Sequence, residues 1–177
     1  KVLEAHDRLN GNTYKALNHQ DRAAMPTPTV EWCIPQLIPA KDATLIVGEP
    51  KVGKTRAAIA IVKSLLQTKD CLGCMPCGQV PWVIFVSDDQ SAGDTADMMK
   101  AADIYNHPKL LWSQRFRLTA DQLDQLLRDI KTHPGAVVVI DSLRSISTST
   151  GVDENSAQMA TLVYDLKQTA TDAGGTM

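Results

Sequence analysis

The amino-acid sequence predicts an α/β fold, a mostly parallel β-sheet with helices on both faces. Apolar, β-branched runs of strand length alternate along the chain with segments whose apolar residues recur at helical spacing. One strand-like run leads into a glycine-rich loop, and two later runs end in aspartates. Such alternation joins parallel strands through right-handed βαβ crossovers and covers both faces of the sheet.

The N-terminal part of the chain divides at about residue 30. Residues 1–29 are polar and end in the breaker-rich stretch 25–29, so we expect a linker or the tail of a preceding element. Residues 30–177 are expected to form the folded domain. Its proline-limited apolar lead-in, residues 32–39, should pack against the core.

The expected elements follow in order from the patterns. Residues 44–47 are β-branched and apolar and end at a glycine, which predicts a buried strand. A helix follows because apolar residues recur at 59, 62 and 66, and a second strand is expected at 82–86. Residues 91–102 suit a helix, and 116–118 a short edge strand.

The second half repeats the alternation. Thr119 and Gln122 have the spacing of a helix capping box, and apolar residues at 123, 126, 127 and 130 mark one helix face. Residues 136–140 are apolar throughout and predict a buried strand. The last helix is marked by apolar residues at 159, 162, 163 and 166. The chain begins with Lys1 and stops after this helix, where a further strand is expected, so we expect a piece of a longer protein, incomplete at its C-terminus.

Composition excludes several classes of protein. The 177 residues are 44% hydrophobic and 21% charged with a net charge of −2, which suits one globular domain and rules out nucleic-acid capture through bulk positive charge. Binding of nucleic acid through a local basic patch is still compatible with this composition. The longest apolar runs fall far short of the roughly 20 residues of a membrane span. Four cysteines do not form a secreted disulfide framework, so a cytoplasmic location is expected.

A phosphate-binding loop carries the main functional signal. Residues 48–55 match the pattern G-x-x-x-x-G-K-[ST] in full, between a predicted strand and a predicted helix. Backbone N–H groups of such a loop bind phosphates, the lysine contacts the β- and γ-phosphates, and the hydroxyl ligates Mg²⁺. The alternative is a chance glycine turn. We therefore expect ATP and Mg²⁺ at this nucleotide-binding set: Gly48, Glu49, Pro50, Lys51, Val52, Gly53, Lys54, Thr55 and Arg56.

Two acidic positions complete the expected chemistry. Asp141 follows the apolar run 136–140, at a strand end where ligands bind, so we expect it to hold Mg²⁺ together with Thr55; the alternative is an aspartate that begins a turn. Asp88 and Asp89 follow the strand 82–86, and one carboxylate there could orient the attacking water. The alternative is a solvated acidic turn.

These residues together resemble RecA-fold ATPases of the RepA type, which are related to hexameric replicative helicases. The resemblance spans roughly residues 30–177 and is much more specific than the phosphate loop alone. It is carried by Trp32-Cys33-Ile34-Pro35, Leu37-Ile38-Pro39, the loop 47–56, the stretch 139–144 and Asp153-Glu154-Asn155. It implies a RecA-like core, ATP hydrolysis, ring assembly and a role in DNA replication.

The resemblance also assigns catalytic roles. It implies Lys54 and Asp141 as catalytic, and it places Asp89 where the family has a water-orienting glutamate. The aspartate is one methylene shorter, which predicts slow hydrolysis but unimpaired nucleotide binding. The family continues into a strand with a polar sensor and into residues that act across the subunit interface, and no residue here is assigned to either role.

Three weaker patterns have alternatives. Cys71, Cys74 and Cys77 have metal-like spacing, with Cys33 or His107 as a possible fourth ligand, but cysteine also serves as a small apolar residue, and we expect no metal. Arg144 could contact nucleotide or a neighbouring subunit, or form an ion pair. The polar loop 147–151 could contact DNA or a partner, or act as a linker.

The leading hypothesis is an ATP-hydrolysing RecA-like domain of a RepA-like helicase or related replication protein, active as a homo-oligomeric ring on single-stranded DNA. One alternative is a nucleotide-dependent switch or scaffold that hydrolyses ATP weakly. Another is a small-molecule phosphotransferase, although no arginine-rich lid segment is present. A GTPase is disfavoured because no Asn-Lys-x-Asp guanine-reading motif occurs.

Overall fold

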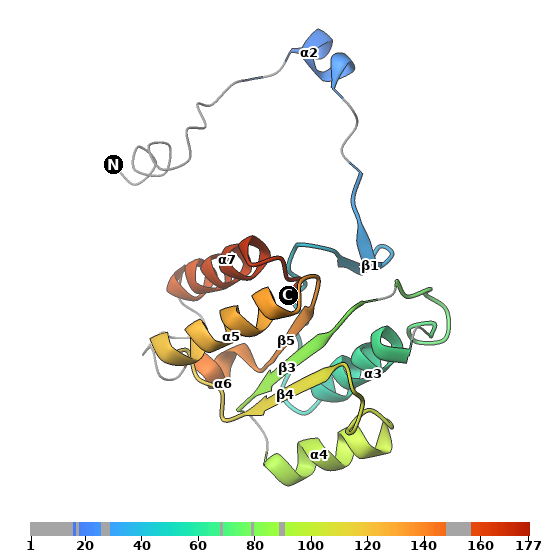
Figure 1. Ribbon diagram of the computed structural model, residues 1–177, viewed down its shortest axis with the longest axis vertical. Coiled ribbons are helices and arrows are strands. Elements are labelled where there is room, and N and C mark those ends of the chain that lie inside the picture. The colour runs from blue at the N-terminus through green and yellow to red at the C-terminus, as the bar shows by residue number, and fades with distance from the viewer. Residues whose placement is uncertain are drawn as a thin grey trace.

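The centre of the molecule is a three-stranded parallel sheet (Figure 1). The structure is a computed structural model and describes residues 16, 18–25, 29–67, 69–78, 80–88, 91–147 and 157–177. The strands are β3 (Val83–Ser87), β4 (Leu110–Gln114) and β5 (Val137–Asp141), in the order β4-β3-β5. In register, Ser87 lies opposite Gln114 on one side and Asp141 on the other, so all three strands present their carboxyl ends at one edge.

Helices cover both faces of this sheet (Figure 1). The helices α3 (Lys54–Gln67) and α4 (Ala92–Ala101) pack on one face, and α5 (Ala120–Thr132) and α7 (Ala157–Asp172) on the other. Side chains alternate between the faces along each strand, because successive strand residues point in opposite directions. The first face buries Val83, Phe85 and Val137 with Ile59, Val62 and Met99, and the second buries Ile84, Val86 and Val138 with Leu126, Ile130 and Ala170. The predicted α/β fold is confirmed.

The helix starts are set by capping side chains. The Ser91 hydroxyl accepts a hydrogen bond from the Asp94 amide at the start of α4, and the Thr119 hydroxyl accepts one from the Gln122 amide at the start of α5. The predicted capping box is only half formed, because the Gln122 side chain accepts from the amide of Arg117 at 2.7 Å instead. This contact ties the loop after β4 to the first turn of α5.

The N-terminal region contains more structure than the sequence predicted. Helix α2 (His19–Ala24) begins with a complete capping box between Asn18 and Asp21, which the sequence analysis missed. It buries no side chain and lies apart from the sheet in Figure 1. The antiparallel pair β1 (Trp32–Ile34) and β2 (Ile38–Pro39) buries Ile34 and Ile38, which confirms the ordered apolar lead-in.

The predicted strand at 44–47 is wrong. The Thr44 amide donates to the Met177 carbonyl, and the Met177 amide donates to the Asp42 carbonyl, but no described residue extends this pairing to residues 45–47. Their side chains are correspondingly exposed, 64% at Leu45, 44% at Ile46 and 81% at Val47. An apolar β-branched run becomes a strand only where a neighbouring strand pairs with it, and no described residue pairs with residues 45–47.

The predicted edge strand at 116–118 is also wrong. The edge strand is β4, six residues earlier, and it ends where Arg115 takes a positive φ of 56°. Phe116 is buried outside the strand, and its amide donates to the Ser87 carbonyl at 3.2 Å. The short helix α6 (Leu143–Ser147), directly after β5, was not predicted either.

Among the helices of the described residues, none combines the length and the apolar character required to cross a bilayer.

Candidate functional site

The phosphate loop takes the shape that its two glycines permit. Gly53 has a φ of +99°, in the region that side chains with a β-carbon disfavour, and Lys51 has a φ of 65°. At Gly48 the constraint is a side chain instead, because a β-carbon there would lie 3.3 Å from the Cγ2 atom of the exposed Val52. A glycine at position 48 therefore avoids a close contact with Val52, and a glycine at position 53 permits a left-handed backbone turn.

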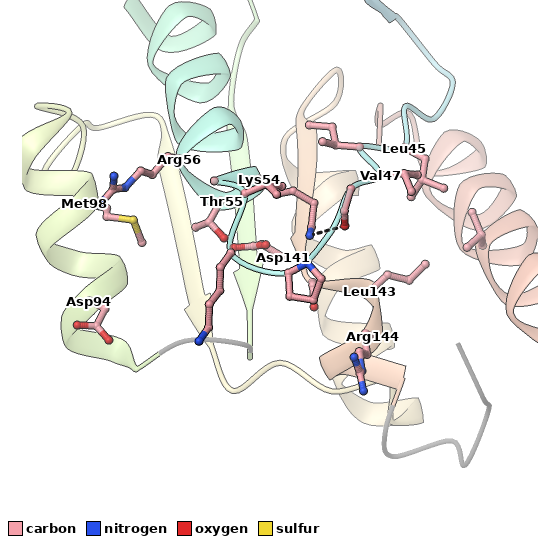
Figure 2. A pocket seen from close by; sticks show the side chains of 18 of the residues that line it. Leu45, Val47, Lys54, Thr55, Arg56, Asp94, Met98, Asp141, Leu143 and Arg144 are labelled. Carbon is pink, nitrogen blue, oxygen red and sulfur yellow. Dashed lines mark hydrogen bonds between the residues drawn. The ribbon is translucent and has the colours of Figure 1, made fainter. Parts of the chain in front are cut away.

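The Lys54 side chain lies back across the loop. Its Nζ atom donates to the carbonyl oxygens of Gly48 and Glu49, each at 2.8 Å. These bonds hold the ammonium group against the loop, at the cavity that Lys54 lines (Figure 2). A bound anion would meet this positive charge together with the loop amides.

Thr55 stands at the start of α3. Its side chain is buried, and the first helical hydrogen bond runs from the Ala57 amide to the Gly53 carbonyl at 2.9 Å. The loop therefore leads directly into a helix N-terminus, whose free amides and dipole favour negative charge. Phosphate binding at this end of α3 requires no further element.

Asp141 lines the same cavity as Thr55. As the last residue of β5 it is held at the carboxyl edge of the sheet, and its peptide bond to Ser142 is cis. Lys54, Thr55 and Asp141 all line one cavity of about 1710 Å³, which Figure 2 shows from close by. The structure thus brings together three residues that the sequence placed up to 87 positions apart.

The remaining predicted residues fall in three groups. Arg56 and Arg144 both line the cavity, one from α3 and one from α6. Asp88 follows β3, and its amide donates to the Asp141 carbonyl at 3.3 Å. Asp89, the stretch 153–155 and the loop 148–151 lie outside the described residues, so the predicted water-orienting group has no described position.

Two walls of the cavity were missed by the sequence analysis. Helix α4 contributes Asp94 and Asp97, and α7 contributes Met159 and Val163. Asp94 belongs to a capping pattern with Ser91, whose hydroxyl donates to the Asp94 carboxylate at 2.7 Å, and this local role hid its position at the cavity. The α7 residues are apolar at helical spacing, which predicts core and says nothing of a ligand.

The cysteines form a separate region. Cys71 pairs with Met75 in a tight turn in which Leu72 and Gly73 both have positive φ. Burial raises the pKa of the Cys71 and Cys77 thiols. Within the described ranges, no group of three or more histidine, cysteine, aspartate or glutamate side chains is placed to hold a metal ion.

The arrangement can bind an anion and a divalent cation side by side. The loop amides, the start of α3 and the Lys54 ammonium suit a polyphosphate, while a hydroxyl and a carboxylate are the oxygen ligands that Mg²⁺ prefers. The fold, the glycine geometry and the donor set therefore all fit a nucleoside triphosphate with its metal.

The chain matches the model of a known protein family. The AAA_25 family, described as an AAA domain, matches residues 12–177 of the chain. A search of curated proteins found no match.

Proposed function

The chain belongs to the AAA_25 family of AAA domains, and from this premise we propose that it binds ATP with Mg²⁺ at the cavity beside the phosphate loop and hydrolyses it. Membership of this family supports a P-loop ATPase domain. The single observation that carries the specific assignment is the convergence of Lys54, Thr55 and Asp141 on one cavity. Residues far apart in sequence have no packing reason to meet there with complementary charges.

The residues have distinct roles in this proposal. The Lys54 ammonium neutralises charge on the β- and γ-phosphates, and the amides of the loop hold the phosphates in place. Thr55 and Asp141 would hold the Mg²⁺, which supplies further positive charge against the phosphate oxygens. Arg56 and Arg144 line the same cavity and add positive charge.

Water activation is assigned to Asp89. The support is its position two residues after β3, whose last residue, Ser87, lies opposite Asp141 in register. A carboxylate there can orient a water molecule and accept its proton. The side chain is one methylene shorter than glutamate, so the proposal includes slow turnover. The second candidate function is a nucleotide-dependent switch that hydrolyses ATP weakly. The short side chain of Asp89 favours this function too, because it predicts slow hydrolysis.

The wider role rests on the resemblance to RepA-type ATPases. We propose a replication-linked, cytoplasmic motor that acts as a homo-oligomeric ring on single-stranded DNA. We also propose that residues 30–177 form the ATPase domain and residues 1–29 a linker. This boundary is supported by burial, since α2 buries no side chain whereas β1 buries Ile34.

Phosphate release under steady-state conditions tests the proposal. The wild type should hydrolyse ATP slowly in the presence of Mg²⁺, and Lys54→Ala should abolish release. Lys63→Ala, which removes the same charge from the same helix outside the cavity lining, is the matched control and should behave as wild type. Adding single-stranded DNA and measuring the size of the assembly separately test the DNA and ring assignments. Equal phosphate release by wild type and Lys54→Ala would refute the site.

A further inference from the structure

Two aspartates lie on neighbouring strand ends at the carboxyl edge of the sheet. Asp141 ends β5 and lines the cavity, and Asp88 follows β3, the neighbouring strand. The hydrogen bond from the Asp88 amide to the Asp141 carbonyl, at 3.3 Å, fixes their backbones side by side. Both are chemically suited to hold Mg²⁺, yet only Asp141 lines the cavity.

The Asp88 carboxylate faces Arg117. The Nε atom of Arg117 lies 3.4 Å from the Asp88 Oδ2 atom. The Asp88 side chain is only 15% exposed, against 57% for Arg117, so the carboxylate lies largely out of the solvent. The pair is therefore better shielded at its acidic end than an ordinary surface ion pair.

The backbone of Arg117 is held in place on both sides. Immediately before it, Phe116 is buried and its amide donates to the carbonyl of Ser87. The Arg117 amide itself donates to the Gln122 side chain at the start of α5. The loop after β4 is thus fixed to the end of β3, which presents the guanidinium to Asp88.

We propose that Arg117 is a positioning residue that keeps the Asp88 carboxylate turned away from the cavity, so that Asp88 adds no negative charge beside Asp141 at the metal site. The inference rests on the proposed ATP site. A carboxylate released from Arg117 would add one negative charge beside the triphosphate. Charge repulsion over several ångströms in a partly solvated site then weakens ATP binding by about 5-fold.

A rescue experiment tests this directly. Arg117→Gln should weaken ATP binding about 5-fold, with the larger loss at limiting Mg²⁺, because the metal screens the added charge. Asp88→Asn alone should bind ATP as the wild type does. The double variant Arg117→Gln/Asp88→Asn should recover wild-type binding, since the carboxylate that Arg117 restrained is gone. Calorimetric titration measures all four proteins, and thermal unfolding verifies that each is folded.

Arg115→Gln is the matched control, because it removes one positive charge from the exposed chain two residues away and leaves the Asp88 contact intact. It should leave ATP binding unchanged. The inference is overturned if Arg117→Gln binds ATP normally, if Asp88→Asn fails to rescue it, or if Arg115→Gln shows the same loss. A wild type that binds no ATP overturns the proposed function, and the inference with it. Normal binding by the wild type and by Arg117→Gln overturns the inference alone.

Discussion

The two glycines of the phosphate loop predict different responses to the same substitution. A β-carbon at Gly53 meets no atom within 4 Å, but the φ of +99° is strained for alanine. Left-handed backbone costs a residue with a β-carbon roughly 1–2 kcal/mol. Because the loop is exposed, it should relax to avoid this cost and lose the shape that presents its amides. Gly53→Ala is therefore expected to weaken ATP binding by about 5- to 30-fold, since 1.4 kcal/mol corresponds to a factor of ten.

Gly48→Ala provides the comparison within the same loop. Its β-carbon would lie 3.3 Å from the Cγ2 atom of the exposed Val52 side chain, which can move aside, so ATP affinity should fall by less than about 3-fold. The Gly48→Ala/Val52→Ala double variant should remove even that loss. Calorimetric titration gives the affinities, and thermal unfolding shows whether the domain itself is affected. Wild-type affinity in Gly53→Ala, or a greater loss in Gly48→Ala, would refute this account of the loop.

Three further predictions concern other parts of the chain. The hydrogen bond from Lys167 lowers the pKa of Asp42, so Asp42→Asn should lower the free energy of unfolding at neutral pH by less than about 1 kcal/mol. That difference should vanish as the pH falls through the lowered pKa, and a difference that persists in acid would contradict it. In thiol labelling at neutral pH, exposed Cys74 should react first, ahead of the three thiols whose pKa burial raises, Cys33, Cys71 and Cys77. Simultaneous labelling of all four would argue against the packing described. Asp89→Glu should accelerate phosphate release by restoring the longer side chain, and an unchanged rate would remove Asp89 from its assigned role.

Local sequence patterns correctly predicted the elements whose structure depends mainly on neighbouring residues in the chain. The strand runs 82–86 and 136–140 each lie within one residue of β3 and β5, because their apolar β-branched residues are buried between two helical layers. The phosphate loop could be predicted from the sequence because its glycines, lysine and threonine all lie within eight residues. Their backbone freedom and charge are what a phosphate-binding loop requires. The position of Asp141 at the sheet edge was predicted because an acidic residue directly after a buried strand lies where that strand ends.

Features that depend on contacts between residues far apart in the sequence could not be predicted from local patterns. Residues 44–47 have a strand pattern, but whether a strand forms depends on a neighbouring strand, and among the described residues none pairs with residues 45–47. Likewise, the Gln122 side chain caps the amide of Arg117 and not that of Thr119, a choice that depends on how the loop after β4 packs against Ser87. The cavity walls from α4 and α7 belong to the same class, because their residues are ordinary helix positions until the tertiary fold brings them to the site.

ATP binding with and without Mg²⁺ is the most direct test of the central claim that residues 48–55 and Asp141 form one nucleotide and metal site. Calorimetric titration should show that Lys54→Ala weakens binding in both conditions by about 10- to 150-fold, the loss of a charge-assisted contact worth roughly 1.5–3 kcal/mol. Asp141→Asn should match the wild type without Mg²⁺ and lose most of the gain in affinity that Mg²⁺ provides. Wild-type Mg²⁺ dependence in Asp141→Asn, or undiminished binding in Lys54→Ala, would contradict the account.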